Sequence, residues 1–364
     1  MAVLSLAFYI DKYYIRPLFL CQGGGFLLFE LYSFLFSKRE LCAILFWRAS
    51  LNEVIILLDV TLLGTAALMP IPERALTAAV LACAGRSILF DCGEGTQTAA
   101  RKAGVSLMSA DLIALTHYHG DHTFGLPGLL QTLGVQGRTE PLAISGPAGI
   151  QQELSPILQL AGGLPYPVML IDIPPQGLAL HTLHKAWPVE ARLACYPTEH
   201  RVVSQCYAFT LSRPPAFLPE RARALGVPVQ CWKNLQHGQP VVFEGRAVQP
   251  EEVLGPPRRG LKFVFSGDTV ACDGLKTAAQ NADLLISEAT YGENEQDQTA
   301  KEHGHMTFAH AARLAAEANV KRLWLAHYSQ MIENPEDYIE NARQFFPDAV
   351  CGQDGMKITL KYDS

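Results

Sequence analysis

Residues 117–122 read His-Tyr-His-Gly-Asp-His, a dense group of side chains that can bind metal ions. The group follows an apolar run at 112–115 that is typical of a buried strand. Because side chains alternate along an extended segment, His117, His119 and Asp121 are expected to project to the same side, while His122 turns with the following helix. Two imidazoles two residues apart can share one cation, and Asp121 and His122 can hold a second.

Three further candidate ligands each follow a predicted strand of their own. They are His200 after residues 193–196, Asp268 after 263–265 and His327 after 323–325. Imidazole and carboxylate groups suit zinc in sites that keep an open position. Two cations about 3.5–4 Å apart can stabilise a displacement at phosphorus, and a carboxylate such as Asp268 would bridge them. The pattern predicts a two-metal hydrolytic site and disfavours a merely structural role for these histidines.

Alternating strands and helices must position these residues. Apolar and β-branched runs predict strands at 54–63, 79–82, 87–90, 112–115, 142–144, 193–196, 207–211, 263–265, 284–286 and 323–325. Helices are expected at 96–103, 126–133, 150–160, 218–225, 308–318 and 335–346. This order is typical of the α/β class, with residues 54–364 as one domain.

The composition excludes several classes of protein. The chain has 364 residues, of which 49% are hydrophobic, so it can bury a core and is neither disordered nor of low complexity. The 29 Lys and Arg against 35 Asp and Glu create no overall basic field, although a local patch can still hold a phosphate backbone. The nine cysteines are scattered without a C-x-x-C motif, which disfavours a disulfide framework and favours a reducing, cytoplasmic location.

Residues 1–53 form a hydrophobic N-terminal extension of doubtful status. The stretch 17–36 is long enough to span a bilayer, but Glu30 and three consecutive glycines at 23–25 interrupt it. No methionine follows Met1 before Met69, which fits a true start site near residue 54. The extension is either dispensable or associated with a membrane, and its interrupted apolar pattern disfavours membrane association without excluding it.

The histidine motif resembles the signature of the metallo-β-lactamase fold, and its neighbours are similar to motifs of ribonuclease Z, the tRNA 3′-processing endonuclease. They run in the family's order over about residues 58–330: L-G-T at 63–65, D-C-G-E-G-T-Q at 91–97, G-L-P-G-L-L at 125–130, T-E-H-R at 198–201, S-G-D-T at 266–269, S-E-A-T-Y at 287–291, H-M-T at 305–307 and A-H-Y-S at 326–329. D-C-G-E-G-T-Q and H-M-T are the discriminating motifs. The resemblance implies an αββα four-layer sandwich with a two-metal site at one edge of its sheets.

The resemblance also implies a role for each candidate residue. The seven implied metal ligands are His117, His119 and His200 for one zinc ion, Asp121, His122 and His327 for the other, and Asp268 as the bridge between them. Two Zn²⁺ per subunit, or Mn²⁺ in their place, would activate a hydroxide that attacks a phosphodiester. Asp121 is also the implied proton acceptor, and His305, oriented by Glu288, is the implied proton donor. Asp91 either orients a ligand imidazole or is an ordinary turn carboxylate.

The activity implied by the resemblance is removal of the 3′ trailer from precursor tRNA by a homodimer with no obligate protein partner. An arm-like insertion at about 213–260 lies where the family carries its tRNA-gripping arm, and segment 213–262 has eight basic residues against four acidic ones. Lys233 beside Trp232 could combine a phosphate contact with base stacking. The alternative for this segment is an ordinary solvated loop.

Two departures from the family pattern leave other functions open. V-P-V-Q-C-W at 227–232 replaces the Gly-Pro element of the arm, and S-Q-M-I at 329–332 stands where S-x-R-Y is usual. A hydrolase of the same fold that acts on a small phosphodiester or ester is therefore the alternative. The intact ligand set disfavours a non-catalytic RNA-binding or membrane-tethered protein, and His119 disfavours a redox di-iron site.

Overall fold

The computed structural model describes residues 8–11, 14–17 and 57–362, and the chain divides into two compact units, Met1–Ile55 and Ile56–Ser364. In the first unit, β1 (Phe8–Asp11) pairs antiparallel with β2 (Tyr14–Pro17). Residues 18–36, most of the stretch considered as a membrane span, lie outside the described residues. Among the residues that are described, no helix combines the length and apolar character needed to cross a membrane.

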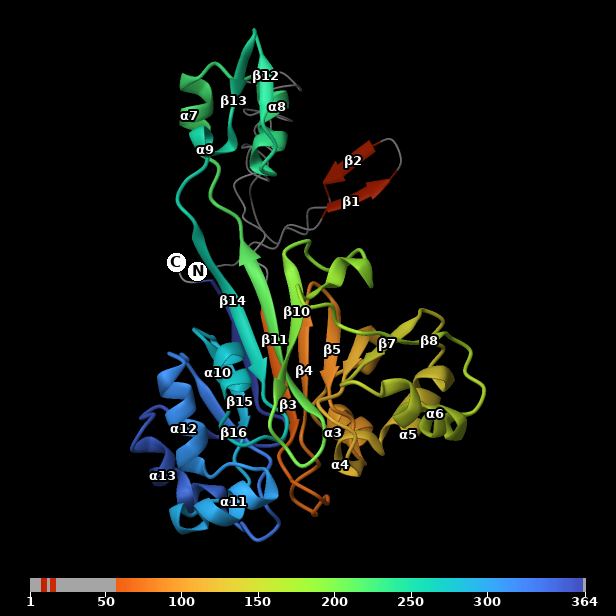
Figure 1. The fold of residues 1–364 in the computed structure, drawn as a ribbon. Helices are drawn as coiled ribbons and strands as arrows, with labels where there is room; N and C mark the ends of the chain where they lie inside the picture. The colour runs from red at the N-terminus through yellow and green to blue at the C-terminus, as the bar shows by residue number, and fades with distance from the viewer. Residues whose placement is uncertain (1–7, 12–13, 18–56, 363–364) are drawn as a thin grey trace, which may run out of the picture. The chain divides into compact units, whose positions relative to one another are not determined.

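Two mixed seven-stranded sheets build the second unit (Figure 1). The first sheet has the order β18 (Lys357–Leu360), β3 (Leu58–Gly64), β4 (Ala78–Cys83), β5 (Arg86–Phe90), β6 (Ala110–Ala114), β7 (Leu142–Ser145) and β8 (Val168–Leu170). The second has the order β17 (Val350–Cys351), β16 (Leu323–Ala326), β15 (Leu284–Glu288), β14 (Arg258–Phe265), β11 (Ser204–Arg213), β10 (Ala191–Thr198) and β9 (Leu178–Ala179). Neighbouring strands are parallel from β5 to β8 and from β14 to β17.

The inner faces of the two sheets share one apolar core. Side chains alternate along each strand, so Ile88 and Phe90 of β5 point into this core while Leu89 between them packs on the outer face. Phe263 and Phe265 of β14 meet Phe90 from the other sheet, with ring centroids 5.5 and 5.6 Å away. These contacts hold the two sheets face to face.

Helices cover the outer faces and complete the four layers. On the first sheet, the outer core includes side chains of α3 (Thr96–Lys102), α5 (Leu126–Val135) and α6 (Ile150–Ala161). On the second, it includes those of α10 (Asp273–Ala279), α12 (Phe308–Glu317) and α13 (Ile339–Arg343). The αββα sandwich expected from the sequence is therefore confirmed.

The segment between β11 and β14 forms a small module at the ends of these strands (Figure 1). Its elements are α7 (Pro219–Ala224), α8 (Val229–Gln236), β12 (Val241–Phe243), β13 (Arg246–Val248) and α9 (Pro250–Val253). Ala222, Leu235, Val241 and Val248 pack in an apolar core of its own. We call residues 214–257 the arm.

The ten expected strands and the helices expected at 96–103, 126–133, 150–160, 218–225 and 308–318 are present. The sequence did not predict β1, β2, β8, β9, β12, β13, α4 (Gly120–Thr123), α8 to α10 or α11 (Asp297–His303). The helix expected at 335–346 is a 3₁₀ turn (Pro335–Tyr338) followed by α13. The strands β17 and β18, of two and four residues, were not predicted because so short a run carries no clear alternation. Residues 54–56 of the first expected strand lie outside the described part of the chain.

Candidate metal centre

The candidate ligands gather where strands of the two sheets end. The group 117–122 begins three residues after β6, His200 lies two residues after β10, Asp268 three residues after β14, and His327 directly after β16. Since β14, β15 and β16 run parallel, their carboxyl ends lie at the same edge of the second sheet. Glu288 is the last residue of β15 at that edge.

A first cluster contains three imidazoles and one carboxylate. Nε2 of His117 lies 2.9 Å from Nδ1 of His119, which lies 3.4 Å from Nε2 of His200. Oδ2 of Asp268 lies 3.7 Å from Nε2 of His117. Each of these four residues offers one potential ligand atom, and the four atoms all lie within 4.8 Å of one another. A single cation between them could be bound by all four.

A second cluster shares Asp268 with the first. Oδ1 of Asp268 lies 3.4 Å from Nε2 of His122 and 3.1 Å from Nε2 of His327. Oδ2 of Asp121 lies 3.4 and 3.7 Å from the same two nitrogens. Asp268 thus directs one carboxylate oxygen to each cluster, which is the arrangement that a bridging ligand requires.

Hydrogen bonds fix the orientation of the ligand rings. The contacts at Nδ1 are His122 with Asp91 Oδ2 at 2.7 Å, His200 with Gly304 O at 2.8 Å, His327 with Thr290 Oγ1 at 3.0 Å and His117 with Thr116 Oγ1 at 3.1 Å. The hydroxyls of Thr290 and Thr116 donate to Glu288 and Asp91, so each accepts from its histidine. A proton on Nδ1 leaves the lone pair of Nε2 directed into the clusters.

This donor set fits a divalent cation. Nε2 of His122, Nε2 of His327 and Oδ1 of Asp268 are buried without a hydrogen-bond partner among the described residues, a costly state for polar atoms. Nδ1 of His119 also lies 2.9 Å from Nε2 of His117 and 3.4 Å from Nε2 of His200, so ring nitrogens of three residues converge as the ligands of one cation would. Burial, reinforced by repulsion from His122, holds the pKa of His117 well below its usual value and favours the neutral ligand form.

The charge balance favours positive charge at the second cluster. Although burial opposes ionisation, the neighbouring imidazoles of His327 and His122 hold the pKa of Asp268 well below its usual range. Burial likewise opposes a charge on His122, yet the carboxylates of Asp268 and Asp91 raise its pKa well above the usual value. A bound cation would supply the positive charge that these carboxylates stabilise.

His305 and Glu288 form a buried pair beside the clusters. Nδ1 of His305 donates to Oε1 of Glu288 at 2.9 Å, and the ring of His305 stacks on that of His327 with centroids 5.5 Å apart. Backbone N–H groups of Thr269 and Met306 also donate to this carboxylate. Burial opposes protonation of His305, but the carboxylate of Glu288 raises its pKa to about 9.

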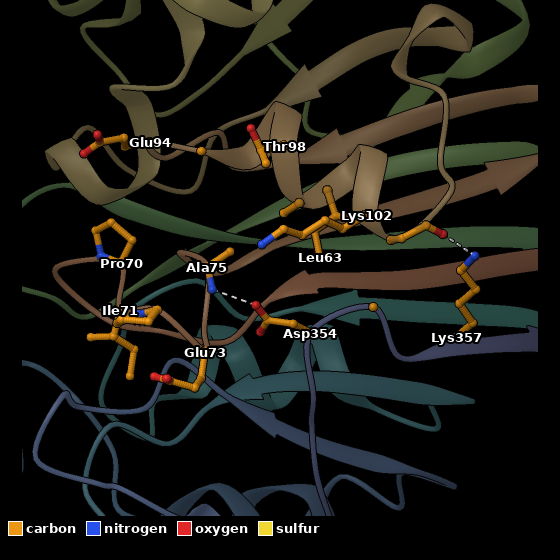
Figure 2. A pocket seen from close by; sticks show the side chains of 15 residues that line it. Leu63, Pro70, Ile71, Glu73, Ala75, Glu94, Thr98, Lys102, Asp354 and Lys357 are labelled. Carbon is orange, nitrogen blue, oxygen red and sulfur yellow. Dashed lines mark hydrogen bonds between the residues drawn. The ribbon is translucent and has the colours of Figure 1, made fainter.

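A separate pocket of about 730 Å³ lies beside the N-terminal end of α3. Its walls come from residues 70–75, the first turns of α3 and residues 354–357 (Figure 2). There the carboxylate of Asp354 accepts a hydrogen bond from the Ala75 backbone N–H at 2.6 Å, drawn as a dashed line in Figure 2. None of the residues in the two clusters lines this pocket, so the candidate metal centre is distinct from it.

Comparisons with known proteins agree with this geometry. Residues 77–190 match the model of the metallo-beta-lactamase superfamily, and residues 226–328 match that of the beta-lactamase superfamily domain. Ribonuclease Z of Lachnoclostridium phytofermentans is 40% identical over 309 residues, covering 84% of this chain and 99% of the relative. Ribonuclease Z of Clostridium tetani is 39% identical over 313 residues, covering 85% and 100%. This chain belongs to the ribonuclease Z family.

Solved structures support the same assignment. The short form of human tRNase Z is 29% identical, covers 82% of this chain and 98% of its own length, and superposes with a TM-score of 0.56. As a member of the ribonuclease Z family, the chain is a metal-dependent endoribonuclease of the metallo-β-lactamase superfamily, and its His and Asp clusters form a divalent metal site.

The structure brings together every residue that the sequence singled out for the site. All seven predicted ligands of this ribonuclease Z family member lie in the two clusters, and His305 pairs with Glu288. The expected common direction of His117, His119 and Asp121 is wrong at its last member, because α4 (Gly120–Thr123) begins before Asp121 and turns it to the second cluster.

Two contributions were missed. The backbone N–H of Leu68, which donates to Oδ2 of Asp121 at 2.9 Å, lies outside the motifs, and the hydroxyl of Thr290 gives no signal beyond its place in one. Trp232 is partly buried: its Nε1 donates to Val227 O, and its ring packs 5.2 Å from that of Phe217 in the arm. Base stacking by this ring stays a prediction.

Proposed function

We propose that this protein removes the 3′ trailer from precursor tRNA and leaves a 3′-hydroxyl on the tRNA. The proposal rests on one combination: identity of about 40% to ribonuclease Z over nearly the whole relative, and two ligand clusters joined through Asp268. We further propose that the divalent site holds two Zn²⁺ ions, with Mn²⁺ as a substitute. His117, His119 and His200 would hold one ion, Asp121, His122 and His327 the other, and Asp268 would bridge them.

Bound metal ions would lower the pKa of a water molecule and neutralise charge on the phosphate. The chain supplies the groups that move protons around that chemistry. We assign Asp121 as the proton acceptor that orients the attacking water, since the Leu68 N–H and the imidazoles of His122 and His327 hold its Oδ2 in place. Although burial opposes ionisation, the neighbouring imidazoles of His122 and His327 keep the pKa of Asp121 below its usual range, so the carboxylate is ready to accept a proton.

We assign His305 as the proton donor to the leaving 3′ oxygen. Glu288 occupies Nδ1 of His305, which leaves Nε2 as the nitrogen that can transfer a proton. Because Glu288 also accepts hydrogen bonds from the Thr269 and Met306 backbones, its orientation and that of the imidazole are fixed together. Glu288 therefore acts as the positioning residue of this pair.

The arm is proposed to hold the tRNA through its basic side chains. The described basic residues of the arm are Arg221, Arg223, Lys233 and Arg246. Lys233 is exposed on α8. Arg246 forms a surface ion pair with Glu252 at 2.9 Å, and its side chain is 53% exposed. Both basic groups are therefore accessible to a phosphate backbone. Because Trp232 is partly buried in the arm, we assign this contact mainly to charge.

A cytoplasmic homodimer is the remaining part of the proposal. The seven cysteines among the described residues are all free thiols, which suits a reducing compartment. The dimer implied by the family resemblance would be tested by light scattering on the purified protein.

Cleavage of a 3′-extended precursor tRNA by the full chain tests the function. Wild-type protein loaded with Zn²⁺ or Mn²⁺ is expected to make a single cut after the discriminator base, and Asp121→Ala or a chelator is expected to abolish it. If the wild type binds two metal ions and hydrolyses bis(p-nitrophenyl) phosphate but leaves the tRNA intact, the substrate is a small phosphodiester instead.

A further inference from the structure

Exposed apolar side chains lie next to the candidate metal centre. Leu68, Phe124 and Met331 are 65%, 71% and 79% exposed. The Leu68 N–H donates to Asp121, Phe124 follows His122 by two residues, and Met331 follows His327 by four. Exposed apolar side chains that gather beside a polar reaction centre are candidates for a binding surface.

Backbone contacts hold Phe124 in place. Its N–H donates to Gly120 O at 2.9 Å, and the N–H of the next residue, Gly125, donates to Cys92 O at 2.9 Å. The ring lies against Gly120, since a Cβ built there would lie 2.5 Å from Cε2 and 2.8 Å from Cδ2 of Phe124. One side of the ring is thus packed on backbone, and the rest faces solvent.

The ring packs on a residue that separates the two clusters along the chain. Gly120, on which it rests, stands between His119 of the first cluster and Asp121 of the second. A phosphate at the metal centre would therefore lie near Phe124, and the nucleotides joined to that phosphate would extend past the ring. The aromatic surface carries no charge to hold a phosphate, but it matches the face of a nucleobase.

Unpaired bases are the part of an RNA that stacks on exposed aromatic side chains. We propose that Phe124 is the stacking platform for an unpaired base adjoining the scissile phosphate, which makes it a determinant of specificity for a single-stranded 3′ end. This inference rests on the proposed function, because it assumes an RNA substrate whose 3′ end is unpaired at the cleavage site. It adds a recognition contact that neither the metal ligands nor the arm provides.

The test compares Phe124→Ala, Phe124→Tyr and the control Leu160→Ala, which removes an equally exposed apolar side chain (78%) on α6. Each full-length, metal-loaded protein is assayed on precursor tRNA under single-turnover conditions. Two further substrates carry an abasic nucleotide, one directly 5′ and one directly 3′ of the cleavage site. Metal content and melting temperature are measured for every variant, so a damaged site is distinguished from a lost contact.

Phe124→Ala is expected to lower kcat/KM on normal precursor tRNA by about 5- to 150-fold, the range of one lost base-stacking contact. Phe124→Tyr and Leu160→Ala should stay within about twofold of wild type, because the ring is kept or the contact is elsewhere. On one of the abasic substrates, the cleavage rate of wild type should fall to the rate that Phe124→Ala shows on normal precursor tRNA. The rate of Phe124→Ala itself should be the same on that abasic substrate as on the normal one.

The outcomes separate this inference from the function beneath it. If wild type leaves the precursor tRNA uncut, the proposed function fails. Two results would leave the function standing and show that the stacking role is wrong. In the first, wild type and Phe124→Ala cut the precursor tRNA equally well. In the second, Phe124→Ala is slower than wild type by the same factor on the normal substrate and on both abasic substrates. Loss of metal or a lowered melting temperature in Phe124→Ala alone would also overturn the stacking role.

Discussion

Oδ2 of Asp91 accepts a hydrogen bond from Nδ1 of His122 at 2.7 Å. The same carboxylate accepts hydrogen bonds from the N–H of Thr116 at 2.7 Å and from its hydroxyl at 2.8 Å. It thereby links the end of β5 to the segment that carries the histidine motif. Of the two roles considered from sequence for Asp91, the structure supports the orienting one.

Asp91→Asn tests this relationship. The backbone of Asp91 has a φ of 57°, which Asn tolerates, so the substitution should preserve the fold. The amide cannot accept all the hydrogen bonds of the carboxylate, and its charge is lost. We expect metal affinity or activity to fall by about 10- to 100-fold, measured by competition with a chromophoric chelator and by cleavage rate. The control Asp59→Asn, on the exposed side of β3, should change neither, and equal affinities for both variants would contradict the prediction.

The sequence predicted the site well because each ligand follows a recognisable strand. His200, Asp268 and His327 end apolar runs. The parallel strands β14, β15 and β16 bring Asp268 and His327 to one edge, and β10 reaches that edge through the antiparallel pairs β10–β11 and β11–β14. The turn that separates Asp121 from His119 was not predictable, because α4 has four residues and so shows no helical periodicity. Local pattern thus identified the ligands and their division between two cations, but not the turn that separates them.

Elements that depend on distant partners were hidden for a different reason. β18 pairs antiparallel with β3, matching Leu360 to Leu58, and nothing local in either segment encodes that contact. The neighbouring Lys233 suggests a stacking role for Trp232, but nothing in that adjacency predicts that the ring also packs against Phe217 in the arm. Sequence proximity to a charge does not reveal which face of a short helix is buried.

Gly93→Ala should disturb the second cluster through the backbone. A Cβ at position 93 would lie 2.0 Å from the carbonyl oxygen of Asp121, so one of the two segments must move. A displacement of about 1 Å at a catalytic group costs roughly 100-fold in rate. Gly85→Ala is the matched control, since its φ of 78° is strained but no atom lies within 4 Å of the added carbon. Cleavage rates would contradict the prediction if the two variants lost activity equally.

Removal of metal should lower stability as well as activity. The partnerless nitrogens of His122 and His327 and the oxygen of Asp268 gain partners only when a cation binds. A ligand present at 100 times its Kd stabilises the folded state by about 2.7 kcal/mol. Dialysis against a chelator is therefore expected to lower the melting temperature by several degrees, and added Zn²⁺ should restore it. Asp268→Ala, which loses the bridge, should respond to neither treatment; an equal chelator shift in this variant would contradict the assignment.

Asp111 should matter for stability without affecting the chemistry. It is 5% exposed and binds the guanidinium of Arg86 through both oxygens, while Nε1 of the buried Trp187 donates to its Oδ2 at 2.7 Å. Asp111→Ala would leave the indole N–H unpaired and the partly buried guanidinium with only the exposed Glu140, which costs about 1–3 kcal/mol in the free energy of unfolding. Glu140→Ala removes the other carboxylate on Arg86, at 3.0 Å and 54% exposed, and should cost less than about 1 kcal/mol. Urea denaturation measures the free energy of unfolding of both variants. If the two variants lose comparable amounts of this free energy, burial of Asp111 is not what stabilises the link between β5, β6 and Trp187.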